Sequence, residues 1–394
     1  MRQRAADVTA SPGLPPNRRR REGPSAVPRT TSRKDPTQAM TIRSEDALAA
    51  LGTVMDPDLH RDLVTLGMIE DLAVDGDRVS FTLVLTTAAC PLKDQIENDA
   101  RTAVLRVPGV KSVEVRTTAR MRKPKDPTAD RKALPGVAHV IAIGSGKGGV
   151  GKSTVAANLA VALAATGARV GLLDGDIYGP NLPRMLGVFK QPSQRANKIV
   201  PVEAHGVSFM SMGLLVEQGE AVVWRGPMLH GAVKSFLHDV DWGELDYLLV
   251  DLPPGTGDVQ LSLIQQTFVA GAVIVSTPST VAIEDAVKAV SMFEKLSVPV
   301  LGLIENMSGF VCPNCSVRHD IFNSGTAEER ALALGIPFLG AVPIDPAARL
   351  GGDTGRPIVL TSPESEAAKA LLHASGELAR RVSIQTHGVA SFQP

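Results

Sequence analysis

Most of the chain is patterned as short apolar runs that alternate with helical stretches. Seven runs stand out by their aliphatic, β-branched content and their length of five or six residues. They are His139–Ile143, Ala168–Leu173, Val207–Met212, Tyr247–Asp251, Ala272–Ser276, Val300–Ile304 and Phe338–Val342. Nearly continuous apolar strands separated by helices are typical of a mainly parallel sheet covered on both faces. The pattern predicts an α/β domain over residues 138–381, followed by a C-terminal tail, 382–394.

A smaller α/β pattern precedes it over residues 41–119. Its predicted elements are a helix at Ser44–Val54, strands at Met68–Val74 and Val79–Thr86, a helix at Leu92–Leu105 and a strand at Val110–Arg116. The two central strands are joined by Asp75-Gly76-Asp77, which suits a tight hairpin. Residues 120–137 mix charged residues with Pro, and we expect them to form a linker between the two domains.

Residues 1–40 differ in composition from the rest of the chain. They are rich in Arg, Pro, Ser and Thr, carry nine Lys/Arg against three Asp/Glu, and show no apolar periodicity. This composition predicts a disordered basic tail. A targeting peptide, or a start of the protein at Met40, is the alternative interpretation.

Charge and cysteine content limit the classes of partner. The chain has a formal net charge of zero and three cysteines, Cys90, Cys312 and Cys315. Zero charge gives no indication of nucleic acid as a partner, and no apolar run reaches the roughly 18 residues of a membrane span. Three cysteines exclude a disulfide framework and suit a reducing compartment. We therefore expect a cytoplasmic protein that binds neither nucleic acid nor membrane.

A phosphate-binding loop follows the first strand of the larger domain. The segment at residues 146–153 matches G-x-x-x-x-G-K-[ST], stands after an apolar strand and opens an alanine-rich helix, the context that the motif requires. Such a loop wraps phosphates with backbone N–H groups, while Lys152 reaches the β- and γ-phosphates of ATP and Ser153 ligates Mg²⁺. The predicted nucleotide contacts are Gly146, Lys147, Gly148, Gly149, Val150, Gly151, Lys152, Ser153 and Thr154.

Two apolar strands end in carboxylates that a magnesium nucleotide would need. Asp251 ends one of them and is predicted to bind Mg²⁺, and the glycine-rich loop after it, Leu252–Asp258, suits a sensor of the γ-phosphate. Asp174-Gly175-Asp176 ends another, and Asp176 is the candidate for orienting the attacking water. A helix cap for Asp251, or a structural turn at residues 174–176, is the alternative in each case.

The phosphate loop carries an additional lysine, Lys147. The run Lys-Gly-Gly-Val-Gly-Lys-Ser-Thr resembles the deviant Walker A motif of the ATPases related to the septum-site and plasmid-partition proteins. The resemblance implies that Lys147 reaches across a two-fold axis to the nucleotide of a partner. Activity would then require a homodimer, and Lys147 and Lys152 would both be catalytic, together with Asp176.

Further segments resemble one branch of that superfamily, the Mrp/ApbC iron–sulfur cluster carrier proteins. In the ATPase part they are Asp174-Gly175-Asp176-Ile177-Tyr178-Gly179-Pro180-Asn181, Trp224-Arg225-Gly226-Pro227-Met228, Asp251-Leu252-Pro253-Pro254-Gly255-Thr256-Gly257-Asp258 and Glu305-Asn306-Met307-Ser308 followed by Cys312-Pro313-Asn314-Cys315. Residues 41–119 are similar to the small iron–sulfur assembly domain often fused in front, through Asp56-Pro57-Asp58-Leu59, Leu66-Gly67-Met68-Ile69 and Thr86-Thr87-Ala88-Ala89-Cys90-Pro91-Leu92. The sequence departs from the family at Phe322-Asn323-Ser324-Gly325-Thr326, where a second Gly-Gly pair is usual. The resemblance implies that Asn306 and the segment Pro343–Asp345 lie near the adenine.

Cys312 and Cys315 form a CxxC pair, which we expect in a loop after the strand that ends near Asn306. Two thiolates can chelate one metal centre, but a closed site usually takes four ligands, which two copies of the chain would supply. Spacing alone leaves Zn²⁺, an iron–sulfur cluster and a redox pair open; the resemblance implies a [4Fe–4S] cluster. Cys90, at a strand-to-helix junction, is either a thiolate stabilised by the helix N-terminus or a buried small residue.

These features predict a homodimeric P-loop ATPase that binds and hydrolyses ATP with Mg²⁺. As the resemblance implies, it would carry a [4Fe–4S] cluster to apo iron–sulfur proteins and work with cluster assembly factors. The alternative is a partition- or positioning-type regulatory ATPase with a structural zinc site. A membrane-positioning ATPase would have a basic amphipathic C-terminal helix, whereas residues 364–381 carry small side chains and mixed charge.

Overall fold

The structure is a computed structural model. It describes residues 42–121, 133–215 and 226–387, apart from Tyr178, Thr256, Pro313 and Ser324. The predicted basic tail 1–40, most of the predicted linker 120–137, the motif residues Trp224 and Arg225, and residues 388–394 lie outside the described residues. Within the described ranges, no helix has both the length and the apolar content that crossing a bilayer takes.

The N-terminal part folds as a small α/β unit. Its elements are α1 (Ser44–Leu51), β1 (Ile69–Asp75), β2 (Arg78–Leu85), α2 (Lys93–Leu105) and β3 (Ser112–Ala119), so each predicted element is confirmed to within a few residues. The sheet has the order β1-β2-β3, with β1 antiparallel and β3 parallel to β2. Asp75 pairs with Arg78 across the predicted hairpin, and Gly76 takes the positive φ of 62° that the turn requires. Phe81, Leu83 and Ile96 lie in its core.

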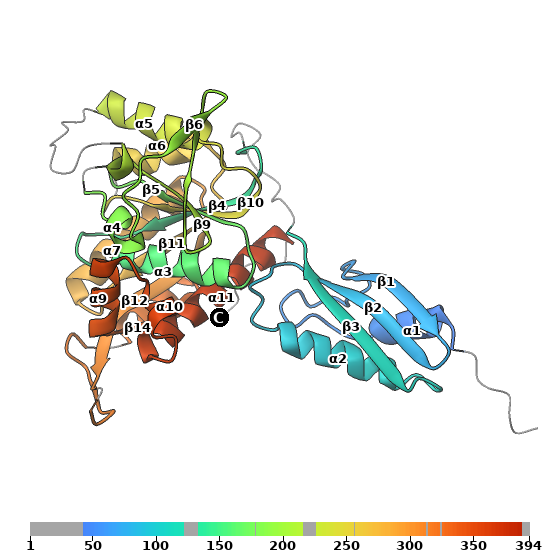
Figure 1. The fold of residues 1–394 in the computed structure, drawn as a ribbon. Coiled ribbons are helices and arrows are strands. Elements are labelled where there is room, and N and C mark those ends of the chain that lie inside the picture. The colour runs from blue at the N-terminus through green and yellow to red at the C-terminus, as the bar shows by residue number, and fades with distance from the viewer. Residues whose placement is uncertain are drawn as a thin grey trace, which may run out of the picture. The chain divides into compact units, whose positions relative to one another are not determined.

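All seven predicted strands of the C-terminal part are present and parallel to one another (Figure 1). They are β4 (Val137–Gly144), β5 (Val170–Asp174), β9 (Val207–Ser211), β10 (Leu245–Asp251), β11 (Gly271–Ser276), β12 (Val300–Val311) and β14 (Phe338–Ile344). Two short antiparallel strands, β8 (Val202–Ala204) and β13 (Arg318–His319), join them, and β6 (Ser193–Arg195) pairs with β7 (Lys198–Val200) in a separate ribbon. The order β13-β12-β11-β4-β10-β5-β9-β8, with β14 also on β12, puts β4 and β10 side by side in the middle.

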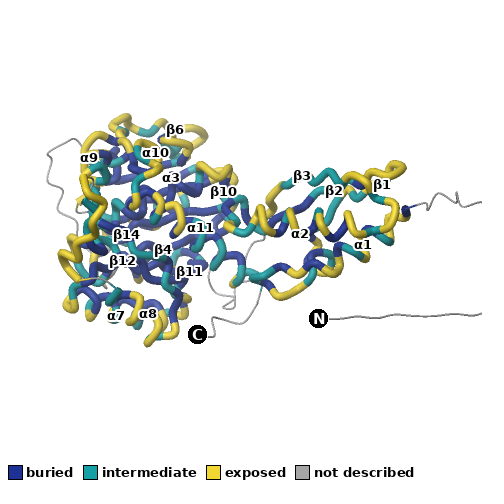
Figure 2. The backbone as a smooth tube through the Cα atoms, turned by 90° about the horizontal axis from the view of Figure 1, so that it is seen from below, coloured by how far each residue is buried: buried dark blue, intermediate teal, exposed yellow. Residues whose placement is uncertain are grey.

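Helices cover both faces of this sheet. They are α3 (Lys152–Ala165), α4 (Leu182–Leu186), α5 (Gly226–His238), α6 (Asp258–Gln266), α7 (Thr280–Lys295), α8 (Thr326–Leu334), α9 (Pro346–Thr354), α10 (Ile358–Thr361) and α11 (Glu366–Thr386). Side chains of β4 alternate between the faces: Ile141 and Ile143 belong to the core formed with α3, α10 and α11, whereas Val140 and Ala142 belong to the core formed with α5 to α8. Figure 2 shows the result, with buried central strands and exposed outer segments.

The last helix extends beyond its predicted end. We placed a tail at residues 382–394, but α11 continues to Thr386. Leu378 and Val382, four residues apart on one helical face, are both buried, with exposures of 0% and 2%. The apolar stripe therefore runs one turn further than the composition suggested.

Candidate functional site

The phosphate loop lies between β4 and α3, where the motif places it. Gly149 and Gly151 have φ values of 82° and 78°, a left-handed conformation that favours glycine. A Cβ added at Gly146 would lie 2.1 Å from the carbonyl carbon of Asp285. The loop conformation therefore depends on glycine at these positions, and the N-terminus of α3, which begins at Lys152, opens directly from it.

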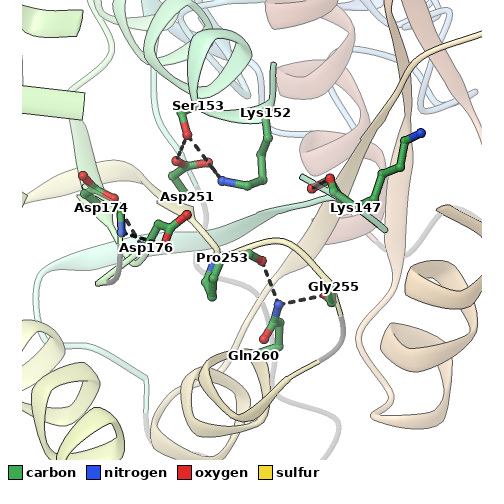
Figure 3. Close-up of polar contacts among 11 residues, drawn as sticks. Lys147, Lys152, Ser153, Asp174, Asp176, Asp251, Pro253, Gly255 and Gln260 are labelled. Carbon is green, nitrogen blue, oxygen red and sulfur yellow. Dashed lines mark hydrogen bonds and ion pairs between the residues drawn. The ribbon is translucent and has the colours of Figure 1, made fainter. Parts of the chain in front are cut away.

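Lys152 and Ser153 converge on Asp251 at the end of β10 (Figure 3). Lys152 Nζ lies 2.7 Å from Asp251 Oδ1, and the Ser153 hydroxyl donates to Oδ2 at 2.5 Å. Lys152 is 6% exposed and Asp251 0%, so the charges form a buried pair. Burial raises the pKa of Asp251, and the adjacent ammonium of Lys152 opposes that shift.

The same residues suit a magnesium ion. Mg²⁺ prefers hard oxygen ligands, typically one or two carboxylates together with phosphate oxygens and water. The Ser153 hydroxyl and the Asp251 carboxylate are in contact, so both oxygens can serve one ion. When bound, that ion would neutralise charge on the phosphates. The role of Asp251 as a magnesium ligand stays a prediction.

Strand register places a second carboxylate beside Asp251. Asp251 pairs with Asp174 of β5, which pairs with Ser211 of β9. Asp174 is 1% exposed and accepts hydrogen bonds from the Ser211 hydroxyl at 3.0 Å and from the Asp176 N–H at 3.2 Å. Burial, followed by the negative charge of Asp251, raises the pKa of Asp174 well above its usual range. Ser211 was not predicted, although it ends an apolar strand in the same way as the carboxylates.

Asp174→Asn is expected to stabilise the nucleotide-free protein at neutral pH. A carboxyl whose pKa is raised on folding lowers the free energy of unfolding above its unfolded pKa, by about 1.4 kcal/mol for each tenfold weakening of its ionisation. Asparagine removes that cost and can still bond Ser211 and the Asp176 N–H. Thermal midpoints measured in a chelating buffer should be higher for the variant at pH 7. They should converge with those of wild type as the pH falls through the unfolded pKa of about 3.9, because Asp174 is then protonated in both states. A difference in thermal midpoint that stays constant with pH would show that it does not come from ionisation of Asp174.

The other predicted catalytic residues stand at the edges of the site. Asp176 is half-buried beside Asp174 and accepts a hydrogen bond from the Gly179 N–H at 3.3 Å. In Figure 3 the ammonium of Lys147 points away from Lys152 and Asp251. The structure thus groups Lys152, Ser153 and Asp251 tightly, places Asp176 next to them, and directs Lys147 elsewhere.

Gln260, which was not predicted, fixes the glycine-rich loop after Asp251. Its amide Nε2 donates to the carbonyl oxygens of Pro253 and Gly255, at 2.9 Å each (Figure 3). The Gly255 N–H in turn donates to the carbonyl of Ser145 at 2.9 Å. Gln260 is 1% exposed, so a buried side chain fixes the conformation of the predicted γ-phosphate sensor, and the backbone of Gly255 joins that sensor to the residue before the phosphate loop.

Asn306 reaches the phosphate loop from β12. Its Nδ2 donates to the carbonyl oxygen of Val150 at 2.9 Å. Asn306 pairs with Val342 of β14, just before the predicted adenine segment Pro343–Asp345. The Asp345 side chain caps α9 by accepting from the Ala347 N–H at 2.8 Å. Asn306 therefore lies between the phosphate loop and that segment, while its contact with adenine stays a prediction.

The cysteine pair follows β12 directly, in the hairpin formed with β13. Cys312 and Cys315 are free thiols, and Cys315 is exposed. Hydrogen bonds from the backbone N–H groups of Asn314 and Cys315 lower the pKa of Cys312, which favours the thiolate that binds metals. Among the residues that the structure describes, no three His, Cys, Asp or Glu side chains gather around a common point.

Cys90 differs from Cys312 in the direction of its pKa shift. It is half-buried against the core of the small domain, and burial raises its pKa to about 11. Of the two interpretations of Cys90, the structure favours the packed thiol over the thiolate.

Comparisons with known proteins give matches in both parts of the chain. Residues 136–379 match a family described as NUBPL iron-transfer P-loop NTPase, and residues 44–116 match one described as iron–sulfur cluster assembly protein. An iron–sulfur cluster carrier protein of Deinococcus radiodurans is 54% identical over 341 residues, which cover 86% of this chain and 95% of that protein. One of Synechocystis is 50% identical over 349 residues, covering 87% and 99%.

A solved structure resembles the ATPase part. It is a nucleotide-binding protein from Archaeoglobus fulgidus in complex with ADP, with a TM-score of 0.52 and 40% identity, and it covers 59% of this chain and 92% of that one. The fold class predicted from the apolar pattern and the phosphate loop is confirmed by this likeness.

Proposed function

Because this chain belongs to the family of NUBPL-type iron-transfer P-loop NTPases, we propose that it carries an iron–sulfur cluster and transfers it to apo-proteins, driven by ATP. The family and its nucleotide-binding relative make the chain an ATPase. One observation supports an iron–sulfur cluster as the cargo. A pair of free, partly exposed thiols lies at the end of β12, and this strand contacts the phosphate loop. The lowered pKa of Cys312 suits metal binding.

The proposed cluster is [4Fe–4S], held between two copies of the chain. Such clusters are usually bound by four thiolates, and Cys312 and Cys315 supply two from each copy. In a homodimer Lys147 can reach the nucleotide of the second copy, because its ammonium points away from Lys152 and Asp251 of its own chain in Figure 3. A cluster shared across an interface can be released when the interface changes, which suits a carrier. The clients are apo iron–sulfur proteins, and assembly factors supply the cluster.

The ATPase residues have separate proposed tasks. The triphosphate displaces Asp251 as the partner of Lys152, whose ammonium then faces the β- and γ-phosphates. Asp251 and Ser153 hold the magnesium nucleotide, and Asp176 orients the attacking water. Lys147 of the partner completes the charge stabilisation as the bond to the γ-phosphate breaks. Gln260 holds the carbonyl of Gly255, whose N–H donates to Ser145.

Anaerobic reconstitution with iron and sulfide tests the cargo. Wild type is expected to acquire brown charge-transfer absorption and four irons per two chains, and to activate an apo-protein that requires a cluster. Cys312→Ala/Cys315→Ala should lose the absorption, the iron and the activation. The matched Cys90→Ala variant should keep them, because Cys90 is half-buried against the core of the small domain.

The contrary outcome is a colourless protein with tightly bound zinc. It would leave the ATPase in place and remove the carrier function. A partition-type regulator with a structural zinc site would then be favoured. A cluster that loads equally well in the double variant would likewise contradict the proposed site.

A further inference from the structure

We propose that Asn306 is a positioning residue that couples the phosphate loop to the cysteine pair through β12. This rests on the proposed function in one respect, namely that Cys312 and Cys315 bind the cargo. The nucleotide would act on the two cysteines through β12. The proposed path consists of one side-chain contact and one strand.

The contact between Asn306 and the phosphate loop is tight. Its Nδ2 donates to the carbonyl oxygen of Val150 at 2.9 Å, and Val150 is 2% exposed. A Cβ at Gly151 would lie 2.2 Å from the same nitrogen. The loop and the amide are therefore in direct contact at two successive residues, so a shift of the loop around a phosphate displaces Asn306 or breaks its hydrogen bond.

Asn306 stands where the pairing of β12 with β11 ends, because that pairing reaches Glu305. The register of β12 with β14 shifts at Leu303–Ile304 and again between Asn306 and Phe310. Met307 and Gly309 have positive φ values of 59° and 76°. Positive φ is unfavourable for a side chain such as that of methionine, and irregularities of this kind re-aim the strand that follows. The direction of the cysteine hairpin is therefore set immediately after Asn306.

The hairpin is tied back to this irregular segment. The guanidinium of Arg318 on β13 donates to the Ser308 carbonyl at 2.8 Å and to its hydroxyl at 3.1 Å. Val311, the residue before Cys312, pairs with Arg318. A displacement at residues 306–308 therefore moves both strands of the hairpin.

The segment that follows the cysteine hairpin is anchored to Glu305, the residue before Asn306. The buried carboxylate of Glu305 accepts from the N–H groups of Gly325 at 3.1 Å and Ala327 at 2.8 Å, at the start of α8. Residues 305–308 thus contact both the cysteine hairpin and the segment that follows it, and Asn306 among them contacts the phosphate loop.

The test measures thiol reactivity in the cluster-free protein. Rates of alkylation of Cys312 and Cys315 by iodoacetamide, resolved by peptide mass spectrometry, are compared with and without Mg·ATP. The protein concentration is chosen so that light scattering gives the same mass with and without Mg·ATP. A change in alkylation rate then does not come from dimerisation. In wild type, ATP is expected to change the rates by about threefold or more, since one hydrogen bond corresponds to roughly a two- to tenfold effect.

Asn306→Ala, at saturating ATP and with an unchanged thermal midpoint, should abolish that response. Asn306→Asp, which is isosteric but replaces the donor with an acceptor, should also abolish it. A wild-type protein without a response, or variants that keep it, would overturn the proposal.

Inorganic tripolyphosphate separates this role from a contact with the adenine. Because the proposed path begins at the phosphates, tripolyphosphate at saturation should change the wild-type alkylation rates in the same direction as ATP. A response to ATP with none to tripolyphosphate would assign Asn306 to the base and overturn the coupling. No cluster is present in any of these measurements. An absent alkylation response would therefore not contradict the carrier function. A protein that fails to load a cluster could still show the alkylation response.

Discussion

Lys152→Ala is expected to abolish ATP hydrolysis and to destabilise the nucleotide-free protein, whereas Lys152→Ala/Asp251→Asn should recover the stability alone. The single variant leaves a carboxylate that is 0% exposed without its 2.7 Å ammonium partner, and breaking a buried pair from one side costs about 3–5 kcal/mol. Asparagine removes the charge and can still bond Ser153. Hydrolysis should fall by roughly 10²–10³-fold or more in both variants, since the charge that stabilises the transferring phosphate is gone in both.

Denaturant unfolding and phosphate release, measured on the same preparations, separate the two effects. If Lys152→Ala unfolds at the same denaturant concentration as wild type, the ion pair is not a structural element of the nucleotide-free state. If Lys152→Ala/Asp251→Asn remains as unstable as the single variant, the loss comes from packing of the lysine stem and not from charge.

The larger sheet was predictable because its strands are buried on both faces. Runs such as Tyr247–Asp251 and Ala272–Ser276 have to be apolar throughout, and that signal survives in a single sequence. The two-residue strand β13 at Arg318–His319 is exposed and carries no such signal. The extension of β12 from Ile304 to Val311 was missed for a related reason: residues 305–309 are polar or glycine in part, and the extension is held by pairing with β14 and β13 on either side of an irregular segment.

The phosphate loop was predictable because its motif is local, and Asp251 because a carboxylate ends an apolar strand. The strand order that brings the partners of the loop together was not predictable. Asp251 and Asp174 become neighbours only because β10 lies between β4 and β5, contrary to chain order. Asn306 and Val150 are 156 residues apart, and their contact depends on the same strand order. Gln260 gave no signal, because a glutamine near the start of a helix is ordinary until the loop carbonyls that it binds are placed around it.

Lys147→Ala is expected to be inactive alone and to regain activity when mixed with Lys152→Ala/Asp251→Asn. The ammonium of Lys147 points away from the phosphate site of its own chain in Figure 3, so its proposed target is the nucleotide of a second copy. In a mixed dimer, the Lys147→Ala chain keeps Lys152 and Asp251 and receives Lys147 from its partner. One of the two sites is then complete. Random pairing of equal amounts should restore at most roughly a quarter of wild-type hydrolysis.

The same mixing experiment gives a different result if Lys147 acts on the nucleotide of its own chain. In that case every site in the mixed dimer lacks either Lys147 or Lys152, and no activity returns, even where light scattering and differential tagging show that mixed dimers form. A Lys147→Arg variant serves as the matched control, because it keeps the charge and should retain part of the hydrolysis with an unchanged affinity for ATP. Affinity measured for each variant separates loss of binding from loss of the catalytic step. Restored activity in the mixture would place the partner's Lys147 at the ATP site and show that hydrolysis takes place in the dimer.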